Sequence, residues 1–356
     1  MKLPVLSEST RALETCGYCP KLCRAECPVS DVEPRDSLTP WGKMTLAWLA
    51  ERGDVPSDLG HADVVWGCSG CYACLNSCEH DNPVVPTLLA ARQHVRQHSA
   101  APPGVERLLA RQAKRAKWVA ERVARASERL QLGDRCERAL LIGCGYWLYE
   151  PQLAYRLSAA LRKLVGDFRL VAECCGAVHA GAGDALGLAV QQRRTELALA
   201  GVTELLVYDP GCAMAVAHDA VRTVVEVVAD SLEGLSPIPA RIAALGPLRY
   251  HDPCQLGRGL GVYDAPRRVL ERLAGHPVAE FRRHRRDARC SGAGALLPQS
   301  FPTAALDIAR ERVAEHEALG GGTIVTACSS SLRQLRRAGA DAIDLAALVA
   351  EGITPE

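Results

Sequence analysis

Eight cysteines in the first third of the chain are spaced as ligands of iron and sulfur. The segment Cys68-Ser-Gly-Cys71-Tyr-Ala-Cys74-Leu-Asn-Ser-Cys78, here called the second motif, separates its thiols by two, two and three residues. The first motif lies upstream as Cys16-Gly-Tyr-Cys19-Pro-Lys-Leu-Cys23-Arg-Ala-Glu-Cys27, followed by Pro28. Thiolates at such intervals can face one cluster of iron and sulfide. Structural zinc is the alternative, because it also binds thiolates of Cys-x-x-Cys pairs.

Two such motifs in one chain, the first ending in Cys-Pro, are typical of two-cluster ferredoxins. In that pattern the fourth cysteine of each motif binds the other cluster, so the sequence predicts two [4Fe–4S] clusters with crossed ligands. The predicted sets are Cys16, Cys19, Cys23 and Cys78 for one cluster, and Cys68, Cys71, Cys74 and Cys27 for the other. Two features depart from the simplest pattern. Three residues separate Cys19 from Cys23, and Glu79 stands where proline is usual.

Composition favours a protein of the reducing cytoplasm. The chain has 356 residues, 16 of them cysteine, and its N-terminus lacks the pattern of a signal peptide. Thiols stay reduced in the cytosol, so this many cysteines indicate metal ligands more than disulfides. A net charge of +1 and 4% aromatic residues argue against nucleic-acid binding. No apolar run is long enough for a transmembrane helix, although peripheral contact with a membrane stays open.

Helical patterns surround the two motifs. Thr39 and Pro40 predict the start of a helix that runs to Gly53, and an extended exit over 82–86 precedes another helix from Thr87. Residues 1–100 are therefore predicted to form a helical two-cluster ferredoxin domain. Residues 101–135 are predicted to be a basic linker with one long helix over 105–130. Its basic face is either a solvated connector or a docking surface for a partner or an anionic lipid.

Short apolar runs alternate with amphipathic helices beyond Arg138, which is typical of a parallel α/β sheet. Strands are predicted at 139–142, 204–208 and 323–326. A cysteine follows each strand at or near its end, namely Cys144, Cys212 and Cys328. Ligands of open α/β sheets gather at the carboxyl ends of strands. These cysteines are thus candidate site residues.

The C-terminal cysteines also follow an internal repeat. Cys174 and Cys212 are separated by as many residues as Cys290 and Cys328, and Cys144 and Cys254 stand ahead of them. The segment Cys174-Cys175-Gly-Ala corresponds to Cys290-Ser291-Gly-Ala. Two related α/β units are predicted, over 136–246 and 247–356. The predicted fold is therefore multi-domain, α plus α/β.

These motifs resemble a known family. GCGYWLYEP, ECCGAVHAGAG and YDPGCAM look like one unit of a cysteine-rich CCG domain, and YHDPCQLGR, CSGAGALLP and VTACSSSLRQL look like a second. With the N-terminal motifs, the chain resembles the heterodisulfide reductase-related iron–sulfur proteins. That group includes the iron–sulfur subunits of glycolate, lactate and anaerobic glycerol-3-phosphate oxidation. The resemblance implies five thiolates in each unit around a cluster, which in some members is a noncubane pair of fused fragments that works on disulfides.

The chain does not keep all five thiolates in either unit. The first unit has Ala215 at the fifth position and keeps Cys144, Cys174, Cys175 and Cys212. The second has Ser291 and Ser331 at two positions and keeps Cys254, Cys290 and Cys328. The first unit is therefore the better cluster site, because three thiolates leave an iron open or need a serine oxygen. The alternatives for Cys174-Cys175 are a pair of structural thiols and a vicinal disulfide.

Other candidates are weaker. Cys136 is left over and predicted to be a plain thiol. His179, His218 and His251 lie near the motifs, although most loop histidines neither ligate nor move protons. A basic run over 282–289 is either a solvated loop or a surface for an anionic substrate or an acidic electron donor. No nucleotide-binding motif stands between a strand and a helix.

The sequence predicts an electron-transfer subunit of a cytoplasmic oxidoreductase, with two [4Fe–4S] clusters and one further cluster in the CCG domain. No flavin or nicotinamide motif is present, so hydride chemistry would belong to a flavoprotein or another redox partner. Two alternatives stay open. One is a disulfide reductase acting at an open iron of the CCG domain, and the other is a redox sensor or adaptor without catalysis. No catalytic residue can be named from the sequence.

Overall fold

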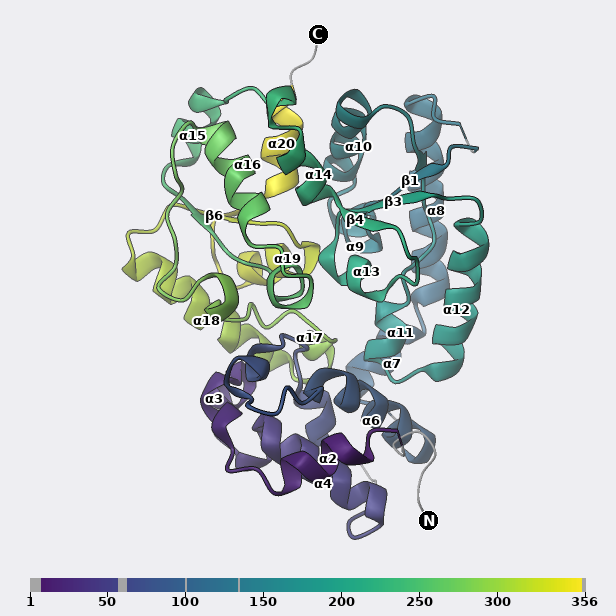
Figure 1. Ribbon diagram of the computed structural model, residues 1–356, viewed down its shortest axis with the longest axis vertical. Helices are drawn as coiled ribbons and strands as arrows, with labels where there is room; N and C mark the ends of the chain where they lie inside the picture. The colour runs from purple at the N-terminus through teal and green to yellow at the C-terminus, as the bar shows by residue number, and fades with distance from the viewer. Residues whose placement is uncertain (1–7, 57–62, 100, 134, 354–356) are drawn as a thin grey trace. The chain divides into compact units, whose positions relative to one another are not determined.

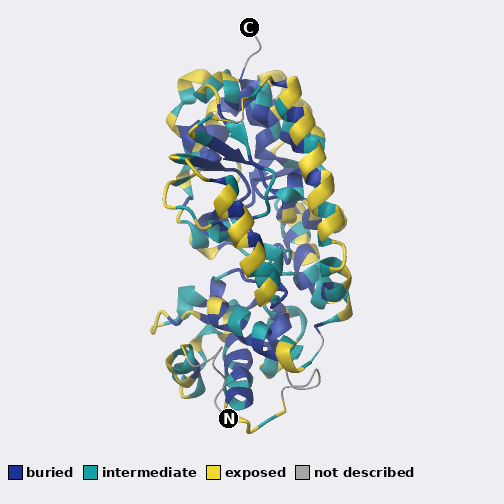
Figure 2. Cartoon of the chain, turned by 90° about the vertical axis from the view of Figure 1, so that its right-hand side faces the viewer, coloured by how far each residue is buried: buried dark blue, intermediate teal, exposed yellow. Residues whose placement is uncertain are grey.

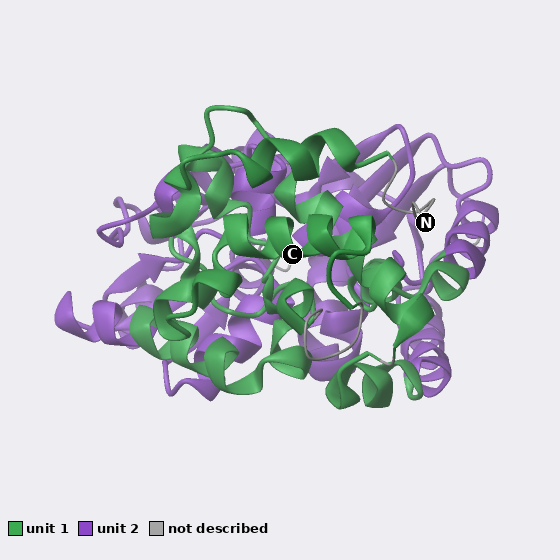
Figure 3. Cartoon of the chain, turned by 90° about the horizontal axis from the view of Figure 1, so that it is seen from below, with its two compact units in different colours: residues 1–111, 177–188, 289–312 green, residues 112–176, 189–288, 313–356 purple. Residues whose placement is uncertain are grey.

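The computed structural model describes residues 8–56, 63–99, 101–133 and 135–353 (Figure 1). The chain packs into two compact units (Figure 3). Unit 1 comprises Met1–Arg111, Ala177–Leu188 and Arg289–Arg312, and unit 2 comprises Gln112–Gly176, Ala189–Ala288 and Val313–Glu356. Two segments of the cysteine-rich region therefore pack with the N-terminal part. The domain boundaries predicted above follow sequence motifs and stay a prediction.

Unit 1 is built from helices and single helical turns. They are α2 (Thr10–Gly17), η1 (Leu22–Glu26), α3 (Pro28–Val32), η2 (Asp36–Leu38), α4 (Pro40–Arg52), η3 (Asp63–Gly67), η4 (Ala73–Ser77), α6 (Val84–His98), α7 (Pro103–Leu109), α11 (Ala177–Gly181) and α17 (Leu297–Ser300). Two longer helices, α12 (Ala185–Ala198) and α18 (Pro302–Ala318), begin in unit 1 and end in unit 2.

The helix predicted between the two motifs is confirmed as α4. The Thr39 hydroxyl caps it by accepting a hydrogen bond from the Gly42 N–H at 3.0 Å, and Gly53 ends it with φ at 80°. The extended exit over 82–86 is wrong in part, because α6 begins at Val84. Pro86 is tolerated there because the first turn of a helix leaves its N–H groups without intrahelical partners.

The single long helix predicted over 105–130 is instead two helices. α7 ends at Leu109, and α8 (Gln112–Arg129) begins after a short break. Pro103 starts α7 at a position where its missing N–H costs nothing. No helix among the described residues is both long and apolar enough to cross a lipid bilayer.

Unit 2 contains two parallel sheets. The first has the order β2-β1-β3-β4, with β1 (Arg138–Leu141), β2 (Arg169–Leu170), β3 (Glu204–Val207) and β4 (Val221–Thr223). The second has the order β5-β6-β7, with β5 (Leu248–Tyr250), β6 (Thr323–Thr326) and β7 (Ala342–Asp344). A parallel bridge from Arg249 to Ala279 extends it on the β5 side. Both sheets thus have the same strand order, as the internal repeat predicts.

The helices of unit 2 cover these sheets. Besides α8 they are α9 (Cys144–Tyr149), α10 (Pro151–Val165), α13 (Pro210–Ala215), α14 (Val224–Asp230), α15 (Pro239–Leu245), α16 (Asp264–Ala274), α19 (Ser329–Arg337) and α20 (Leu345–Gly352), with the turns η5 (Leu232–Gly234), η6 (Gln255–Gly259) and η7 (Arg285–Asp287). The strands β1, β3, β5 and β6 are buried (Figure 2). Strands that are buried on both faces appear in the sequence as continuous apolar runs.

One hydrophobic core joins the first half of unit 2 (138–176 and 189–246) to its second half (247–288 and 313–353). α10 of the first half packs on α20 of the second, and α14 of the first packs on α16 of the second. By strand order α10 corresponds to α16, and α14 corresponds to α20. The two contacts are therefore equivalent, and the halves are related by an internal two-fold arrangement.

Candidate metal centres

Five of the predicted ligands line a cavity in unit 1, here called the first cavity. The cysteines that line it are Cys16, Cys19, Cys23, Cys74 and Cys78. Cys78 of the second motif therefore shares a cavity with three thiols of the first motif, as the crossed ligand rule expects. The ligand assignment itself stays a prediction.

The thiols of the first cavity are hard to ionise without a cation. Burial, followed by repulsion from the neighbouring thiols, raises the pKa of Cys16 to about 12. Burial likewise raises the pKa of Cys23 to about 11. A bound metal would release these protons, and its positive charge would offset the repulsion among the thiolates.

Asn82 supplies neutral hydrogen-bond donors to the first cavity. Its side-chain Nδ2 donates to Cys16 Sγ at 2.9 Å and to the Ala12 carbonyl at 2.8 Å. Its backbone N–H donates to Cys78 Sγ at 3.4 Å. Asn82 is buried, so these donors lie in a place where water reaches the sulfurs poorly. Donors of this kind orient and tune sulfur ligands.

The other three predicted ligands of unit 1 line a second cavity together with Cys74. The cysteines that line it are Cys27, Cys68, Cys71 and Cys74. Cys27 of the first motif therefore joins three thiols of the second, again as the crossed rule expects. Cys74 lines both cavities, so the two cavities adjoin each other.

A buried cation faces the second cavity. Lys43 is 1% exposed, and its Nζ donates a hydrogen bond to Cys27 Sγ at 3.3 Å. The Gly70 N–H donates to Cys68 Sγ at 3.4 Å. Burial raises the pKa of Cys68, and the positive charges of Lys43 and Arg92 oppose that rise.

Both motifs use the same local turn. Lys21 and Tyr72 adopt the left-handed conformation, with φ of 69° and 59°, and each precedes a 3₁₀ turn. Cys23 is the second residue of η1, as Cys74 is the second residue of η4. The extra residue of the first motif is thus absorbed before the turn, and the third cysteine keeps its place.

Arg92 holds the loop of the second motif from inside unit 1. Its guanidinium is 0% exposed and donates to backbone carbonyls only. The acceptors are the carbonyls of Val65 at 3.0 Å, Trp66 at 3.4 Å, Cys68 at 2.8 Å, Gly181 at 2.9 Å and Ala295 at 2.6 Å. Arg92 therefore ties the motif to both later segments of unit 1. Burial lowers its pKa to about 10.

The cysteines of the first CCG unit meet in unit 2. Cys144 and Cys175 each hydrogen-bond to Cys174, and Cys175 also hydrogen-bonds to Cys212. These bonds and burial raise the pKa of Cys144 and of Cys175 well above the ordinary value. All four thiols are free, so Cys174 and Cys175 form no vicinal disulfide here. The four predicted ligands are thus brought together.

Gly143, which directly precedes Cys144, lets the chain pass close to Asp209 and Cys212. Gly143 has φ of 106°, and a Cβ there would lie 2.7 Å from the Asp209 Cβ and 3.4 Å from Cys212 Sγ. It lets the chain turn from β1 into α9, whose first residue is Cys144. Asp209 caps α13 through the Gly211 N–H and accepts a 2.7 Å hydrogen bond from the Ser329 hydroxyl. Burial raises the Asp209 pKa.

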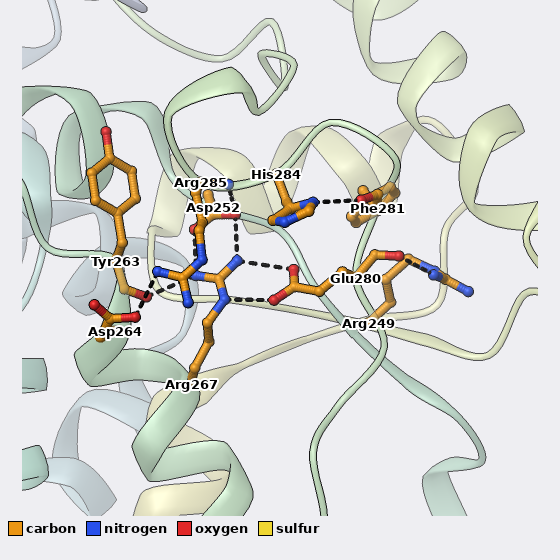
Figure 4. A network of polar contacts seen from close by, with 9 residues as sticks. All are labelled: Arg249, Asp252, Tyr263, Asp264, Arg267, Glu280, Phe281, His284 and Arg285. Atoms are coloured by element: carbon orange, nitrogen blue, oxygen red, sulfur yellow. Dashed lines mark hydrogen bonds and ion pairs between the residues drawn. The ribbon is translucent and has the colours of Figure 1, made fainter.

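In the second half, a charged network supports the loop of Cys254 (Figure 4). Arg267 donates two hydrogen bonds to Asp252, at 2.8 and 2.9 Å, and two to Glu280, at 2.5 and 2.9 Å. Asp252 also accepts from the Arg285 N–H at 2.8 Å, and the hydrogen bonds and charge of Arg267 lower its pKa. Asp252 stands two residues before Cys254, so the network fixes where that thiol lies.

The three cysteines of the second CCG unit are divided between the two compact units of the structure. Cys254 and Cys328 follow β5 and β6 in unit 2, whereas Cys290 belongs to unit 1. Ser331 hydrogen-bonds to Cys328, whose pKa burial raises to about 12. In unit 1, the Cys290 thiol donates to the Ser69 hydroxyl at 3.7 Å. Cys290 thus lies beside the loop of the second motif.

The weaker candidates have local partners. His179 lies 2.8 Å from Asp184, and His218 lies 3.2 Å from the Val202 carbonyl. His251 is buried with its ring edge on Phe281. The Cys136 thiol donates to a backbone carbonyl at 3.3 Å, which suits a plain thiol. In the basic run, Arg285 pairs with Asp264 and Arg289 with Asp31, so part of this run serves structure.

Sequence reasoning missed Lys43, Asn82 and Arg92. Nothing in the spacing of Lys43 or Arg92 from the cysteines marks them as sulfur or loop partners. Only Asn82 carried a signal, because it follows Cys78 closely and precedes a proline.

The donor sets fit iron–sulfur clusters. No three His, Cys, Asp or Glu side chains of the described ranges gather closely enough to hold a single metal ion. In unit 1 the thiols line two adjoining cavities. Thiolates in sets of four are the ligands that such clusters take.

Comparisons with known proteins agree with this chemistry. Residues 139–217 and 248–336 match the family of CCG cysteine-rich domains, and residues 12–82 match the family of 4Fe-4S dicluster domains. The two CCG matches correspond to the two halves that share one strand order. The chain therefore contains iron–sulfur clusters.

Relatives include subunits of redox enzymes. One subunit of the dihydromethanophenazine:CoB–CoM heterodisulfide reductase of Methanosarcina mazei is 26% identical over 361 residues, covering 90% of this chain and 87% of the relative. EtfAB:quinone oxidoreductase of Syntrophomonas wolfei is 26% identical over 67% of this chain and 37% of its own. One subunit of the fumarate reductase (CoM/CoB) of Methanothermobacter marburgensis is 26% identical over 44% of this chain and 32% of its own. The chain therefore joins a 4Fe-4S dicluster domain to a repeated CCG cysteine-rich domain, and it is homologous to this heterodisulfide reductase subunit.

Proposed function

We propose that the chain is the electron-transfer subunit of an oxidoreductase, with two [4Fe–4S] clusters in unit 1 and one further cluster in unit 2. The observation that carries this proposal is the pair of cavities that share Cys74. The proposed ligands of the first cavity are Cys16, Cys19, Cys23 and Cys78. Those of the second cavity are Cys27, Cys68, Cys71 and Cys74. When bound, such clusters supply one-electron chemistry.

The further cluster is assigned to Cys144, Cys174, Cys175 and Cys212. Their mutual hydrogen bonds support this assignment, because they show the four thiols close together, and iron would bind them with release of their protons. The second CCG unit keeps three thiols, one of which, Cys328, bonds to Ser331. We therefore expect a labile cluster, an open iron or no cluster there.

A partner is needed to complete the reaction. The relatives described above include subunits of multi-subunit redox enzymes, and no flavin or nicotinamide motif was found in this sequence. We expect a flavoprotein or another redox protein to exchange electrons with the chain. Sixteen free cysteines favour a reducing compartment such as the cytoplasm.

The test is anaerobic purification of the chain from its native host, with iron analysis, electron paramagnetic resonance and identification of the proteins that copurify. We expect about 12 irons per chain, four for each of three clusters, and a flavoprotein partner. Reduction of a disulfide by the isolated chain would instead support the disulfide reductase. A chain with neither partner nor turnover would be the sensor or adaptor.

A further inference from the structure

We propose that Lys43 tunes the second cavity of unit 1, so that the cluster held there has a higher reduction potential than the cluster of the first cavity. This inference rests on the two ligand sets proposed above. It adds an order in which the two centres accept electrons, and it assigns that order to one side chain.

The fold aims Lys43 at Cys27. Thr39 caps α4, and Gly42 lets its first turn lie close to the preceding loop, since a Cβ there would be 2.1 Å from the Asp36 carbonyl oxygen. The Lys43 side chain is consequently buried at 1% exposure, with Nζ 3.3 Å from Cys27 Sγ. Lys43 forms no ion pair with a carboxylate in the part of the chain that the structure describes.

A second cation supports the same cavity. The buried Arg92 guanidinium donates to the Cys68 carbonyl at 2.8 Å. Both cations act on the Cys68 sulfur strongly enough to oppose the effect of burial on its pKa. Two buried positive charges therefore lie near the second set of ligands.

The first cavity lacks this charge. Its sulfurs receive neutral N–H donors from Asn82, and its described lining contains no lysine or arginine. Lys21 lies 3.9 Å over the ring of Trp41, which lines this cavity, but Lys21 is half-buried and its charge is screened by water. Each cavity also has one carboxylate at its lining, the exposed Glu79 in the first and the half-buried Glu26 in the second.

The charges near the two cavities determine which of the two clusters is reduced first. One-electron reduction adds a negative charge to a cluster, and a buried ammonium near its ligands stabilises the reduced form more than the oxidised form. Hydrogen bonds to ligand sulfurs act in the same direction in both cavities, so they do not by themselves separate the two potentials. The charges of Lys43 and Arg92 have no counterpart in the lining of the first cavity. Lys43 donates directly to a predicted ligand sulfur, so we assign to it the larger part of the rise in the potential of the second centre.

The experiment is a redox titration of the anaerobically purified full chain, followed by electron paramagnetic resonance, on the wild type and on two variants. Lys43→Met keeps the length of the side chain and removes its charge. This variant should lower the midpoint potential of the second cluster, the higher of the two, by at least about 59 mV, which is a tenfold change in the equilibrium constant of a one-electron reduction. The midpoint potential of the first cluster should not change. Asn82→Ala is the matched control and should lower the other midpoint by a smaller amount.

Unchanged midpoints in a Lys43→Met variant of full iron content would overturn the proposal. A shift of the same signal by both variants would also overturn it, since the two residues face different cavities. If Lys43→Met loses iron, the test uses Lys43→Gln instead, because glutamine keeps a hydrogen-bond donor but carries no charge. The proposal then requires Lys43→Gln to lower the midpoint potential of the second cluster. A wild-type chain with fewer than about 8 irons would refute the proposed function before any variant is compared.

Discussion

Tyr146 donates a hydrogen bond of 2.7 Å to Asp344, and this bond joins the two halves of unit 2 inside their common core. Tyr208 donates to the other carboxylate oxygen of Asp344. Tyr146 and Tyr208 come from the first half, whereas Asp344 ends β7 of the second. A buried acid with two tyrosine donors thus fastens one copy of the repeat to the other.

Asp344 should make the stability of unit 2 depend on pH. Burial raises its pKa to about 6, against about 3.9 in the unfolded chain. Between these values the folded state binds the proton more readily, so its stability falls as pH rises through this window. The difference amounts to about 3 kcal/mol. We expect urea unfolding at pH 5 to need more denaturant than at pH 7, on account of this group.

Asp344→Asn is the matching variant, since it keeps an acceptor for the tyrosines and loses the titration. Its unfolding midpoint should change less between pH 5 and pH 7 than that of the wild type. An unaltered pH dependence would show that Asp344 does not titrate in this range.

Cys175→Ala should remove about one cluster, or about four irons per chain, and should abolish electron transfer. Cys175 hydrogen-bonds to two other thiols of its set, so its loss opens the site. Cys290→Ala should cost less iron, because the second CCG unit keeps only three thiolates, against four in the first CCG unit. Iron analysis with electron paramagnetic resonance, on protein prepared without oxygen, measures both. Full iron in Cys175→Ala together with cluster loss in Cys290→Ala would reverse the assignment.

Gly143→Ala should damage the same site through the backbone. Its φ of 106° strains any side chain, and its Cβ would lie 2.7 Å from Asp209. We expect a loss of about 1–3 kcal/mol in unfolding free energy and a fall in iron content. Gly201→Ala is the control, because Gly201 also has a positive φ, 74°, but nothing lies within 4 Å of the added Cβ. Equal iron loss in the two variants would contradict the steric argument.

Arg92→Lys should destabilise unit 1 and loosen the second motif. Lysine cannot reproduce the planar fork that reaches five carbonyls, and hydrogen bonds of a charged donor contribute about 1.5–3 kcal/mol each. We expect at least about 3 kcal/mol of lost stability and selective iron loss. Arg96→Lys, one turn along α6, should cost less than about 1 kcal/mol, because Arg96 makes a partly exposed ion pair with Glu106. Thermal unfolding of both variants gives the comparison.

The cysteine spacing and the capping residues predicted much of the site and of the local structure. Thr39 and Gly53 marked the ends of α4, and the apolar run after Arg138 marked β1, because both signals are local in sequence. The short strands β2, β4, β5 and β7 were not predicted, since two or three residues carry no periodicity.

Long-range partners were beyond sequence reasoning. Lys43 faces Cys27 only because α4 folds back on the first motif, and Arg92 reaches Ala295 from far along the chain. A lysine or arginine within a helical pattern reads as a solvated residue until the packing of that helix is known. For the same reason, the membership of Ala177–Leu188 and Arg289–Arg312 in unit 1 was not anticipated.

The paired contacts of α10 with α20 and of α14 with α16 make unit 2 a dimer whose two halves share one polypeptide. In a dimer of identical chains, every substitution is imposed on both copies at once. Within one polypeptide each copy can diverge alone while its neighbour keeps the shared core closed. Ser291, which stands where the first copy of the repeat carries Cys175, is a change of this kind, and it leaves the four thiols of the first copy intact.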